Sequence, residues 1–496
     1  MADKTFDKND PPQEALRGKA ISGARWGAIA SVATFLFSLG QNVALSRLLT
    51  PRDFGLAGMI WTVLGLAQLF ADAGISNVLL FRQKVTRGEV SSIMWLNLIV
   101  TAVLSLLLLA LTPGLVAYFR EPGLAELVPW AVTAFLLACS STSFRTLVQK
   151  DLRFDTLAWS EIAAGAAALG CSVVVAWRGH GVYALLAASL ASASVKLLLY
   201  CFSLRHDFPL RYHFRYAEVS DAFQFGLYQL GDRITNYLWS NLDYLLIGRM
   251  LGAGPLGYYR LAYETALRPL SLVNPIFNSV AYPLFARKQN DLAAMRRGYL
   301  DMISYIAFLV MPLMAGMAVT AYQLVELVFG KQWLPAVPIL QILCLLSVLR
   351  CLQNPLGALV VARGMPKIGF QFNAALLLLN AVAFPIALRY SLNALAWSAV
   401  ATTAVAAALL WNHVYVQTIE LPATDFLRRL VTPALASGLM GAMVWILLTW
   451  LPKDGPGAVN FAISVGAGAV IYTGLYWRFD PEFLQKFFSM LRGAKS

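Results

Sequence analysis

The sequence predicts an all-α integral membrane protein with about 14 transmembrane helices, arranged as two six-helix bundles in a parallel repeat plus two C-terminal helices. Hydrophobic residues make up 58% of the 496 residues, and the mean hydropathy is +0.63. Charged residues make up 13%, against roughly 25% in soluble domains. About fourteen apolar segments reach the ~20 residues that span a bilayer. Part of the sequence also recurs 202 residues later. This composition excludes a soluble protein.

The apolar segments predict the helices in chain order. They run approximately over 21–49, 53–81, 89–119, 123–147, 155–177, 181–203, 219–251, 255–285, 292–328, 334–361, 366–390, 392–417, 424–451 and 457–479. Some of the longer segments are expected to include turns at the membrane interface. The predicted parts are a tail over 1–20, bundles over 21–217 and 218–420, two extra helices over 421–480, and a tail over 481–496. Because six is even, both bundles enter the membrane in the same direction, which predicts a parallel repeat.

Lysine and arginine are unevenly distributed over the predicted loops, and this predicts the orientation. Of 39 such residues, 26 lie in the tails and alternate loops on one side, and nine lie on the other side. Cytoplasmic loops carry the excess of lysine and arginine in membrane proteins. Both termini are therefore expected in the cytoplasm, and the net charge of +13 does not indicate nucleic-acid binding.

One predicted span carries ionisable residues that a bilayer disfavours. The stretch from Gln224 to Gly257 contains Asp232, Arg233 and Asp243. Ionisable side chains inside a membrane indicate a functional site by default. On a 3.6-residue helix, one stripe must therefore face protein or water. The residues expected on this stripe are Gln229, Asp232, Asn236, Trp239, Ser240 and Asp243.

The repeat includes this polar stripe. The segment 46–55, SRLLTPRDFG, aligns with 248–257, GRMLGAGPLG. The matching polar faces predict a duplicated membrane domain with a cavity shared by the two copies. The polar residues related by the offset are Thr34 with Asn236, Ser38 with Ser240, Gln41 with Asp243, Asp72 with Asn274, and Ser76 with Asn278.

Two more predicted spans carry charged residues in the second half of the chain. Glu264 and Arg268 stand one turn apart, so they form either a local ion pair or part of the cavity. Arg350 has no acid within one turn and is followed by Asn354, which favours a position in the cavity over a structural partner.

Lys196 and Glu161 lie within predicted spans of the first half. Lys196 is close to the cytoplasmic end of its span, so its side chain either extends to the membrane surface or belongs to the cavity. Glu161 is either a proton site or a buried partner for Lys196, and the sequence does not separate these two interpretations.

The sequence lacks features that enzymes and ATP-driven pumps require. It contains no complete G-x-x-x-x-G-K-[ST] pattern, so any pumping is expected to be secondary. The predicted loops are too short for a soluble catalytic domain, and the histidines are not clustered as metal ligands are. We therefore expect no enzymatic activity, no cofactor and no metal site.

Several motifs in combination resemble a known family. They are Ile21-Ser22-Gly23-Ala24-Arg25-Trp26, Asp72-Ala73-Gly74-Ile75 with Arg82-Gln83-Lys84, Asn241-Leu242-Asp243, Leu251-Gly252-Ala253, Gly257-Tyr258-Tyr259, Asn274-Pro275-Ile276, Pro283-Leu284-Phe285-Ala286-Arg287, Trp333-Leu334-Pro335-Ala336-Val337-Pro338 and Arg350 with Asn354-Pro355. Over most of residues 20–370 the chain resembles the Wzx-type polysaccharide flippases of the MOP superfamily, especially the colanic-acid-exporter branch. The resemblance implies a MOP/MATE-like fold.

The resemblance also implies a function. It implies an inner-membrane protein whose two bundles rock, by alternating access, around a central cationic cavity. The implied substrate is a polyprenyl-pyrophosphate-linked oligosaccharide repeat unit, moved to the periplasmic leaflet for exopolysaccharide, capsule or O-antigen synthesis. A polysaccharide polymerase and glycosyltransferases are the expected partners, and the coupling ion, H⁺ or Na⁺, stays open.

The expected site residues fall into three groups. The cations expected to bind the substrate are Arg268, Arg350, Arg233 and Lys196. The acids expected to couple an ion or to line the cavity are Asp243, Glu264, Asp232, Glu161 and Asp72. The polar residues expected to line the cavity are Asn236, Ser240, Gln41, Ser38, Thr34, Asn274, Asn278 and Asn354.

Two other functions fit a membrane protein of this composition. A cation-coupled multidrug exporter of MATE-like fold would favour acidic and aromatic residues in its cavity, and the arginines Arg233, Arg268 and Arg350 argue against it. A membrane polysaccharide polymerase or ligase would need catalytic groups on a sizeable outer loop, and the sequence contains no such loop.

Overall fold

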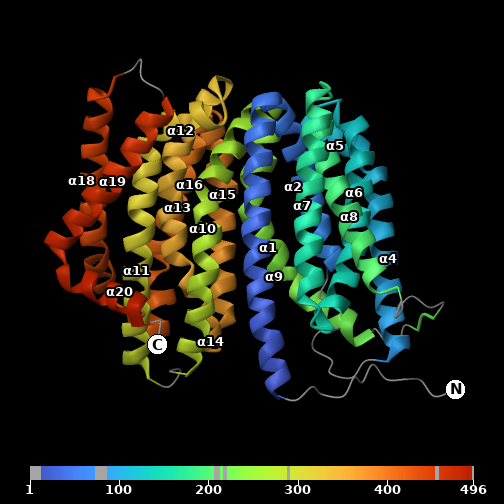
Figure 1. Ribbon diagram of the computed structural model, residues 1–496, viewed down its shortest axis with the longest axis horizontal. Coiled ribbons are helices and arrows are strands. Elements are labelled where there is room, and N and C mark those ends of the chain that lie inside the picture. The colour runs from blue at the N-terminus through green and yellow to red at the C-terminus, as the bar shows by residue number, and fades with distance from the viewer. Residues whose placement is uncertain are drawn as a thin grey trace. The chain divides into compact units, whose positions relative to one another are not determined.

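The computed structural model describes residues 13–72, 86–205, 213–215, 220–287, 291–452 and 457–493, and these ranges contain helices and no strand (Figure 1). In a bilayer every backbone polar group needs a partner within the protein, and a helix supplies one for each residue. The all-α prediction is confirmed. The chain divides into two compact units, Met1–Gly257 and Tyr258–Ser496, called unit 1 and unit 2 below.

Unit 1 contains eight helices in its described part. They are α1 (Gln13–Leu48), α2 (Pro51–Asp72), α4 (Arg87–Ala110), α5 (Thr112–Phe119), α6 (Leu124–Lys150), α7 (Phe154–Trp177), α8 (Tyr183–Ser203) and α9 (Ser220–Met250). The turn from α7 to α8 uses Gly179 and Gly181 at φ angles of 79° and 52°, where a side chain would be strained. The compact unit includes α9, which packs on α2 and α5.

The packing of unit 1 is built on α6, α7 and α8. Helix α7 packs on α1 and α8, and α6 packs on α4 and α8. Apolar residues such as Val90, Phe144 and Val148 form a buried core between these helices. On other faces Leu106 and Leu198 are 67% and 68% exposed, as expected for surfaces that face lipid.

Unit 2 continues the alternation of long helices and short breaks. Its elements are α10 (Ala253–Arg287, which begins in unit 1), α11 (Leu292–Val319), α12 (Ala321–Val328), η2 (Lys331–Ala336), α13 (Val337–Gln353), α14 (Pro355–Ala362), α15 (Pro366–Leu388), α16 (Leu392–Leu409), η3 (Asn412–Val416), α17 (Gln417–Ile419), α18 (Ala423–Trp450), α19 (Gly457–Phe479) and α20 (Pro481–Gly493). Helix α11 packs on α13 and α18, and α16 packs on α13 and α15.

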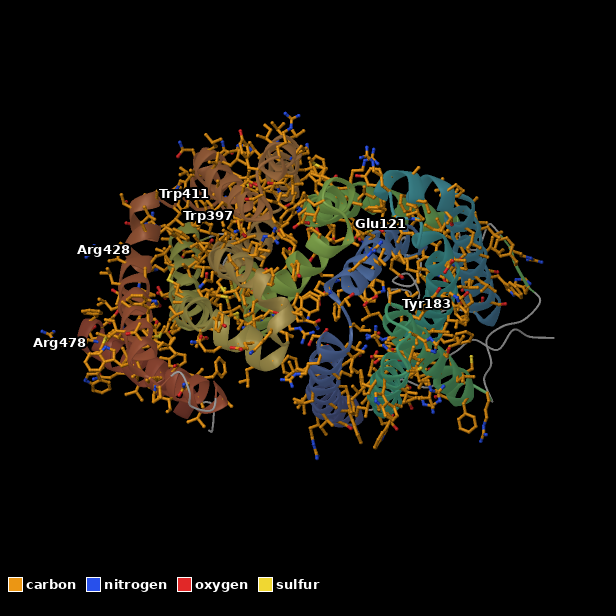
Figure 2. The ribbon with its side chains drawn as sticks, turned by 90° about the horizontal axis from the view of Figure 1, so that it is seen from above. Glu121, Tyr183, Trp397, Trp411, Arg428 and Arg478 are labelled. Carbon is orange, nitrogen blue, oxygen red and sulfur yellow. The ribbon has the colours of Figure 1, made fainter. Side chains whose placement is uncertain are left out.

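The two extra helices α18 and α19 belong to unit 2 and pack against its helix α11. The Tyr472 hydroxyl donates to the Phe308 carbonyl at 2.9 Å. Phe308 also contacts Tyr476 and Phe483 with ring centroids 4.7 and 5.4 Å apart, which brings α20 against α11. Arg428 and Arg478 project outward from α18 and α19 (Figure 2).

The described part contains fewer apolar helices of membrane-spanning length than the fourteen predicted spans. Twelve helices in the described part are long and apolar enough to cross a membrane. The predicted spans over 219–251 and 255–285 fall on α9 and α10, which have 31 and 35 residues but carry too many polar groups for this criterion. A helix of 31 residues is about 46 Å long, so length is no obstacle. The count of fourteen is therefore not confirmed.

The longer predicted spans contain turns, as expected from their length. The segment 89–119 divides into α4 and α5, and 292–328 divides into α11 and α12. In each half of the chain a long helix is thus followed by a helix of eight residues. The segment 334–361 begins in η2 and divides again at Pro355, which lacks a backbone N–H and starts a new helix. The matching divisions of 89–119 and 292–328, one in each half of the chain, support the internal repeat.

The two copies of the repeated segment touch through their glycines. A Cβ atom added at Gly55 would lie 1.7 Å from the carbonyl oxygen of Ala253. One added at Gly257 would lie 1.8 Å from the carbonyl oxygen of Pro51. The offset of 202 residues converts one contact into the other. The first turns of α2 and α10 therefore meet backbone to backbone, an approach that small residues allow in membrane helices.

Two arginines tie the same end of unit 1 together. Arg52 forms an ion pair with Glu121 at 2.9 Å (Glu121 is labelled in Figure 2). Arg249 of α9 donates to the Ala117 carbonyl at 3.0 Å and also to the Tyr118 carbonyl. Carbonyls in the last turn of a helix lack partners within the helix. Arg249 therefore satisfies the end of α5 and fixes α9 against it.

Candidate functional site

A polar cavity of about 280 Å³ lies within unit 1, among helices that span the membrane. It is lined by residues of α6, α7 and α8, with one residue from α2. Its polar lining consists of Gln68, Ser141, Thr142, Arg145, Glu161, Ser189, Ser192, Lys196 and Tyr200. We call this the charged cavity. Two cations and one carboxylate give it a formal charge of +1.

The charges of this cavity interact with one another. The Lys196 Nζ atom lies 2.7 Å from Glu161 Oε2, and the Arg145 Nε atom lies 3.9 Å from Glu161 Oε1. The Lys196 and Glu161 side chains are 28% and 27% exposed. The structure contains the ion pair with Lys196 that is one of the two interpretations of Glu161. The packing of α7 on α8 places the Glu161 carboxylate beside the Lys196 ammonium group.

Arg145 is a residue of this cavity that the sequence analysis missed. The loop count assigns it to the basic side of the membrane together with Lys150 and Arg153. The structure continues α6 to Lys150, so Arg145 stands more than a turn before the helix end. The available signal was its spacing of four from Ser141, which places both on one helix face.

In unit 2, α10 and α13 are joined by polar contacts. Arg350 donates to the Tyr263 hydroxyl, and its guanidinium carbon lies 5.5 Å from the centre of the Tyr263 ring. Cys351, the residue after Arg350, has its Sγ atom 3.4 Å from Asn274 Oδ1, about three turns beyond Tyr263 on α10. Arg350 and Asn274, two predicted site residues, thus each take part in a contact between α10 and α13, and the partner of Arg350 is Tyr263, which the sequence analysis did not single out.

Glu264 has a different partner from the one considered for it. Its Oε1 atom lies 2.7 Å from Nε of Arg260, one turn before it. The considered ion pair with Arg268, one turn after it, is absent. An acid in a helix can pair at i−4 or i+4, and here Arg260 occupies the first of these positions. Arg268 itself is half-buried.

The predicted polar stripe of α1 and α9 divides by burial. Asp243 is 3% exposed, and its Oδ1 atom accepts from the Tyr244 amide at 2.9 Å. Asn236, two turns earlier, is exposed. The Thr34 and Ser240 hydroxyls donate to carbonyls four residues back, at 2.8 and 2.7 Å. The predicted stripe is therefore buried at one residue and exposed at another, and it does not form one continuous polar surface.

For the remaining predicted site residues, the structure gives the degree of burial of four and does not describe the side chains of three. Ser38 is exposed, and Gln41, Arg233 and Asn354 are half-buried. The side chains of Asp72, Asp232 and Asn278 lie outside the described part of the structure. Among the described residues, no group of three His, Cys, Asp or Glu could hold a metal ion.

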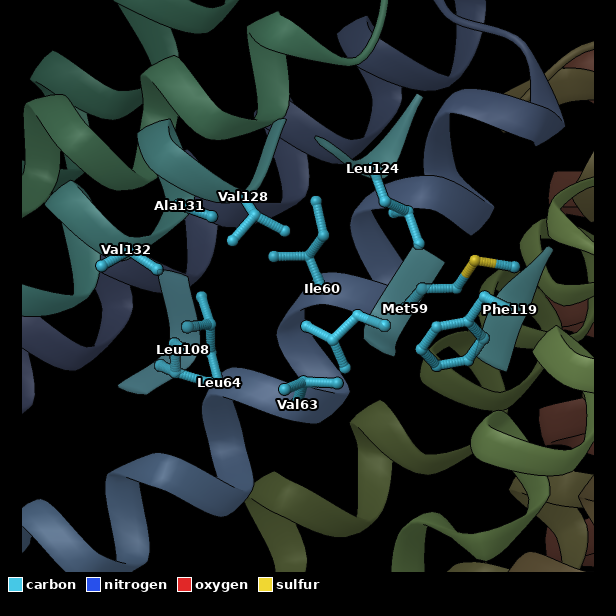
Figure 3. A pocket seen from close by; sticks show the side chains of 11 residues that line it. Met59, Ile60, Val63, Leu64, Leu108, Phe119, Leu124, Val128, Ala131 and Val132 are labelled. Atoms are coloured by element: carbon cyan, nitrogen blue, oxygen red, sulfur yellow. The ribbon is translucent and has the colours of Figure 1, made fainter. Parts of the chain in front are cut away.

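Two apolar pockets differ from the charged cavity. The first lies among α2, α4, α5 and α6, and eleven apolar residues line it, Met59 and Phe119 among them (Figure 3). Its volume of about 10 Å³ is at the limit for one water, so it is packed core. The second, called the apolar groove, has about 420 Å³ and lies between α11, α18 and α19. Gly316, Gly468 and Pro312 help to open it.

The comparisons with known proteins agree with this fold. A family described as "Polysaccharide biosynthesis protein" matches residues 44–338. The lipopolysaccharide biosynthesis protein WzxC of Escherichia coli (strain K12) is 33% identical, over 72% of this chain and 73% of its own length. The teichuronic acid biosynthesis protein TuaB of Bacillus subtilis (strain 168) is 30% identical, over 94% of this chain and 97% of its own.

Solved structures match the fold at lower sequence identity. The lipid II flippase MurJ, in an inward closed conformation, is 15% identical with a TM-score of 0.73, over 92% of this chain and all of its own. An inward-facing multidrug resistance MATE family transporter of the MOP superfamily is 16% identical with a TM-score of 0.57, over 78% of this chain and 95% of its own. The chain therefore belongs to the polysaccharide biosynthesis protein family, and its fold is that of the MOP superfamily.

Proposed function

We propose that the protein is a secondary transporter, a flippase, that moves polyprenyl-pyrophosphate-linked oligosaccharide repeat units from the cytoplasmic to the periplasmic leaflet of the inner membrane. The observation that carries this proposal is the charged cavity, where two cations and several hydroxyls lie within membrane-spanning helices. The family relationship supports it, because the relatives are named as polysaccharide biosynthesis proteins. The product would serve exopolysaccharide, capsule or O-antigen synthesis.

The chemistry of the charged cavity suits this substrate. A pyrophosphate is an anion with many acceptor oxygens, and a guanidinium such as Arg145 offers a planar fork of donors with permanent charge. Moving that anion into a membrane interior without cations would cost several kcal/mol. The hydroxyls of Ser141, Thr142 and Ser189 can bond to sugars. A multidrug exporter for cationic substrates would need the opposite charge balance.

Glu161 gives Lys196 a partner of opposite charge between transport cycles. Its carboxylate holds Lys196 at 2.7 Å. An arriving anion can take over the ammonium group, so Lys196 is never left as an unpaired buried charge. Alternating access would then expose the bound anion first to one side of the membrane and then to the other.

Unit 2 supplies further proposed site residues. Arg268 and Arg350 of unit 2 are proposed as further cations for the substrate, and Arg233 is proposed separately as a cation of unit 1. We also propose that transport is coupled to H⁺ or Na⁺ through one of Asp243, Glu264, Asp232 and Asp72. A polymerase and glycosyltransferases of the same pathway would receive and supply the substrate.

The apolar groove of unit 2 offers a place for the polyprenyl chain. It is open, of about 420 Å³, and lined mainly by apolar residues of three membrane helices. Burial of an isoprenoid there would release little water, because the alternative is the lipid bilayer, so the groove would orient the chain more than it would bind it.

Removing Lys196 should lower export about tenfold. A hydrogen bond to a charged group contributes about 1.5–3 kcal/mol, and ~1.4 kcal/mol corresponds to a factor of ten. Lys196→Met and Arg145→Met can be compared by measuring surface polymer and accumulated lipid-linked repeat units in cells. Arg428→Met is the matched control, because Arg428 is exposed and points outward (Figure 2).

A double variant separates substrate binding from structure. Glu161→Met with Lys196→Met removes both charges. Neither charge is then left without its partner, so the double variant should fold normally. If Lys196 binds the substrate anion, export by the double variant stays low although the protein level is normal. Normal export by the double variant would mean that Lys196 only neutralises Glu161, and the charged cavity would lose its proposed role.

A further inference from the structure

A second polar cavity of unit 1 lies where the connection from α6 to α7 meets the end of α8. Its volume is about 360 Å³, and no residue of the charged cavity lines it. The residues of interest in its lining are Arg153, Asp155, Thr156, Trp159, Ser203 and Arg205. We call it the terminal cavity, because it lies at the helix ends that the loop charges assign to the cytoplasmic side.

The guanidinium groups of the terminal cavity are held in position by the protein. Arg153 Nη1 donates to the Ser203 carbonyl at 2.9 Å, which uses one of the five donors of that side chain. The Arg205 guanidinium lies 4.4 Å above the centre of the Phe202 ring. With Asp155 as the carboxylate among the lining residues, the formal charge of the lining is +1.

The cavity also has a hydroxyl that the protein leaves without a partner. Ser203 Oγ is buried and makes no hydrogen bond with any described residue. A buried polar atom without a partner is unfavourable by about 1–3 kcal/mol. A ligand oxygen in the cavity would remove that penalty.

One wall of the terminal cavity continues into the lipid-facing surface. Trp159 and Phe202 are 59% and 64% exposed, and the neighbouring Leu198 is 68% exposed. The rings of Trp159 and Trp26 lie 6.1 Å apart, and tryptophan is enriched at the level of lipid headgroups. A ligand here would have a polar part inside the cavity and an apolar part against these side chains.

We propose that the terminal cavity binds the phosphodiester headgroup of an anionic membrane phospholipid. The phosphate lies between Arg153 and Arg205, accepts from the Ser203 hydroxyl, and leaves its acyl chains along Trp159 and Phe202. A phosphodiester carries one negative charge, which the formal charge of +1 on the lining balances. The site shares no lining residue with the charged cavity proposed for transport.

The test uses the purified full-length chain in neutral detergent, with dihexanoyl-phosphatidylglycerol as the probe and dihexanoyl-phosphatidylcholine as the uncharged comparison. Arg153→Gln with Arg205→Gln should weaken phosphatidylglycerol binding about fivefold for each arginine, since one basic side chain contributes ~1 kcal/mol near an anionic membrane surface. Arg428→Gln with Arg478→Gln, two exposed arginines of unit 2, should leave the affinity unchanged.

Asp155→Asn tests whether misfolding, and not the loss of charge, explains weaker binding by the arginine variant. It should strengthen phosphatidylglycerol binding about fivefold by the same charge argument, which a damaged fold would not do. Inorganic phosphate should not displace the lipid, since it lacks acyl chains. Unchanged affinity in both the arginine and the Asp155 variants would overturn the proposal. Tighter binding of inorganic pyrophosphate than of phosphatidylglycerol, lost in the arginine variant, would overturn the assignment to a phospholipid.

Discussion

Replacing Gly55 or Gly257 with alanine should abolish export and strongly destabilise the protein. The added Cβ atom would lie 1.7 or 1.8 Å from a backbone carbonyl oxygen, and backbone cannot move aside as the end of a flexible side chain can. Overpacking costs about 1–3 kcal/mol even where side chains relax, so at least ~3 kcal/mol is expected here. The melting temperature of the purified chain and surface polymer in cells measure the two effects.

The chain offers a matched control for this substitution. Gly40 of α1 is also in a membrane helix, and an added Cβ would meet nothing within 4 Å. Gly40→Ala should therefore leave export unchanged and stabilise the helix slightly. Equal effects of Gly55→Ala and Gly40→Ala would show that the backbone contact between the repeated segments is not close in the working protein.

Replacing Arg350 with alanine should reduce export on the order of a hundredfold. Arg350 lies in a half-buried position where it contacts both the hydroxyl and the ring of Tyr263. A charge-assisted contact of ~3 kcal/mol with the pyrophosphate would correspond to this factor. Arg350→Lys keeps the charge but loses the planar fork, so its export should lie between those of the alanine variant and the unmodified protein.

Tyr263→Phe separates the role of Arg350 from that of its neighbour. The variant removes the hydroxyl that accepts from Arg350 and keeps the ring beside the guanidinium. Its export should be close to normal if the arginine acts on the substrate. If Tyr263→Phe is as defective as Arg350→Ala while protein levels stay normal, Arg350 serves to hold α10 and α13 together.

The sequence predicts the fold well because a bilayer imposes simple rules. An apolar segment of ~20 residues has no stable alternative to a helix in lipid, so most predicted spans correspond to one long helix. The two helices with most polar groups, α9 and α10, are the exceptions to the apolar criterion. Their polar residues include members of the repeated polar pairs, such as Asn236 and Asn274.

The candidate site was predicted less completely, for a physical reason. The sequence shows which residues share a helix face, but it does not show how far a helix extends or which neighbour lies opposite. Arg145 falls near the end of the predicted span 123–147 and was counted with the charges of the following loop, because a charge near a predicted helix end has two interpretations. Glu264 could pair at either neighbouring turn, and the structure selects Arg260. The glycine contact depends on how two backbones cross, which residue patterns do not encode.

The most direct test of the proposed function is to reconstitute the purified chain in liposomes with a fluorescent polyprenyl-pyrophosphate-linked oligosaccharide. A sugar-modifying reagent outside the vesicles reports the fraction of substrate in the outer leaflet. We predict that this fraction exchanges rapidly with the unmodified chain and slowly with the Glu161→Met, Lys196→Met double variant, while a phospholipid without sugar or pyrophosphate does not exchange. Equal exchange rates for liposomes with and without the unmodified chain, under the same ion gradients, would contradict the assignment as a flippase.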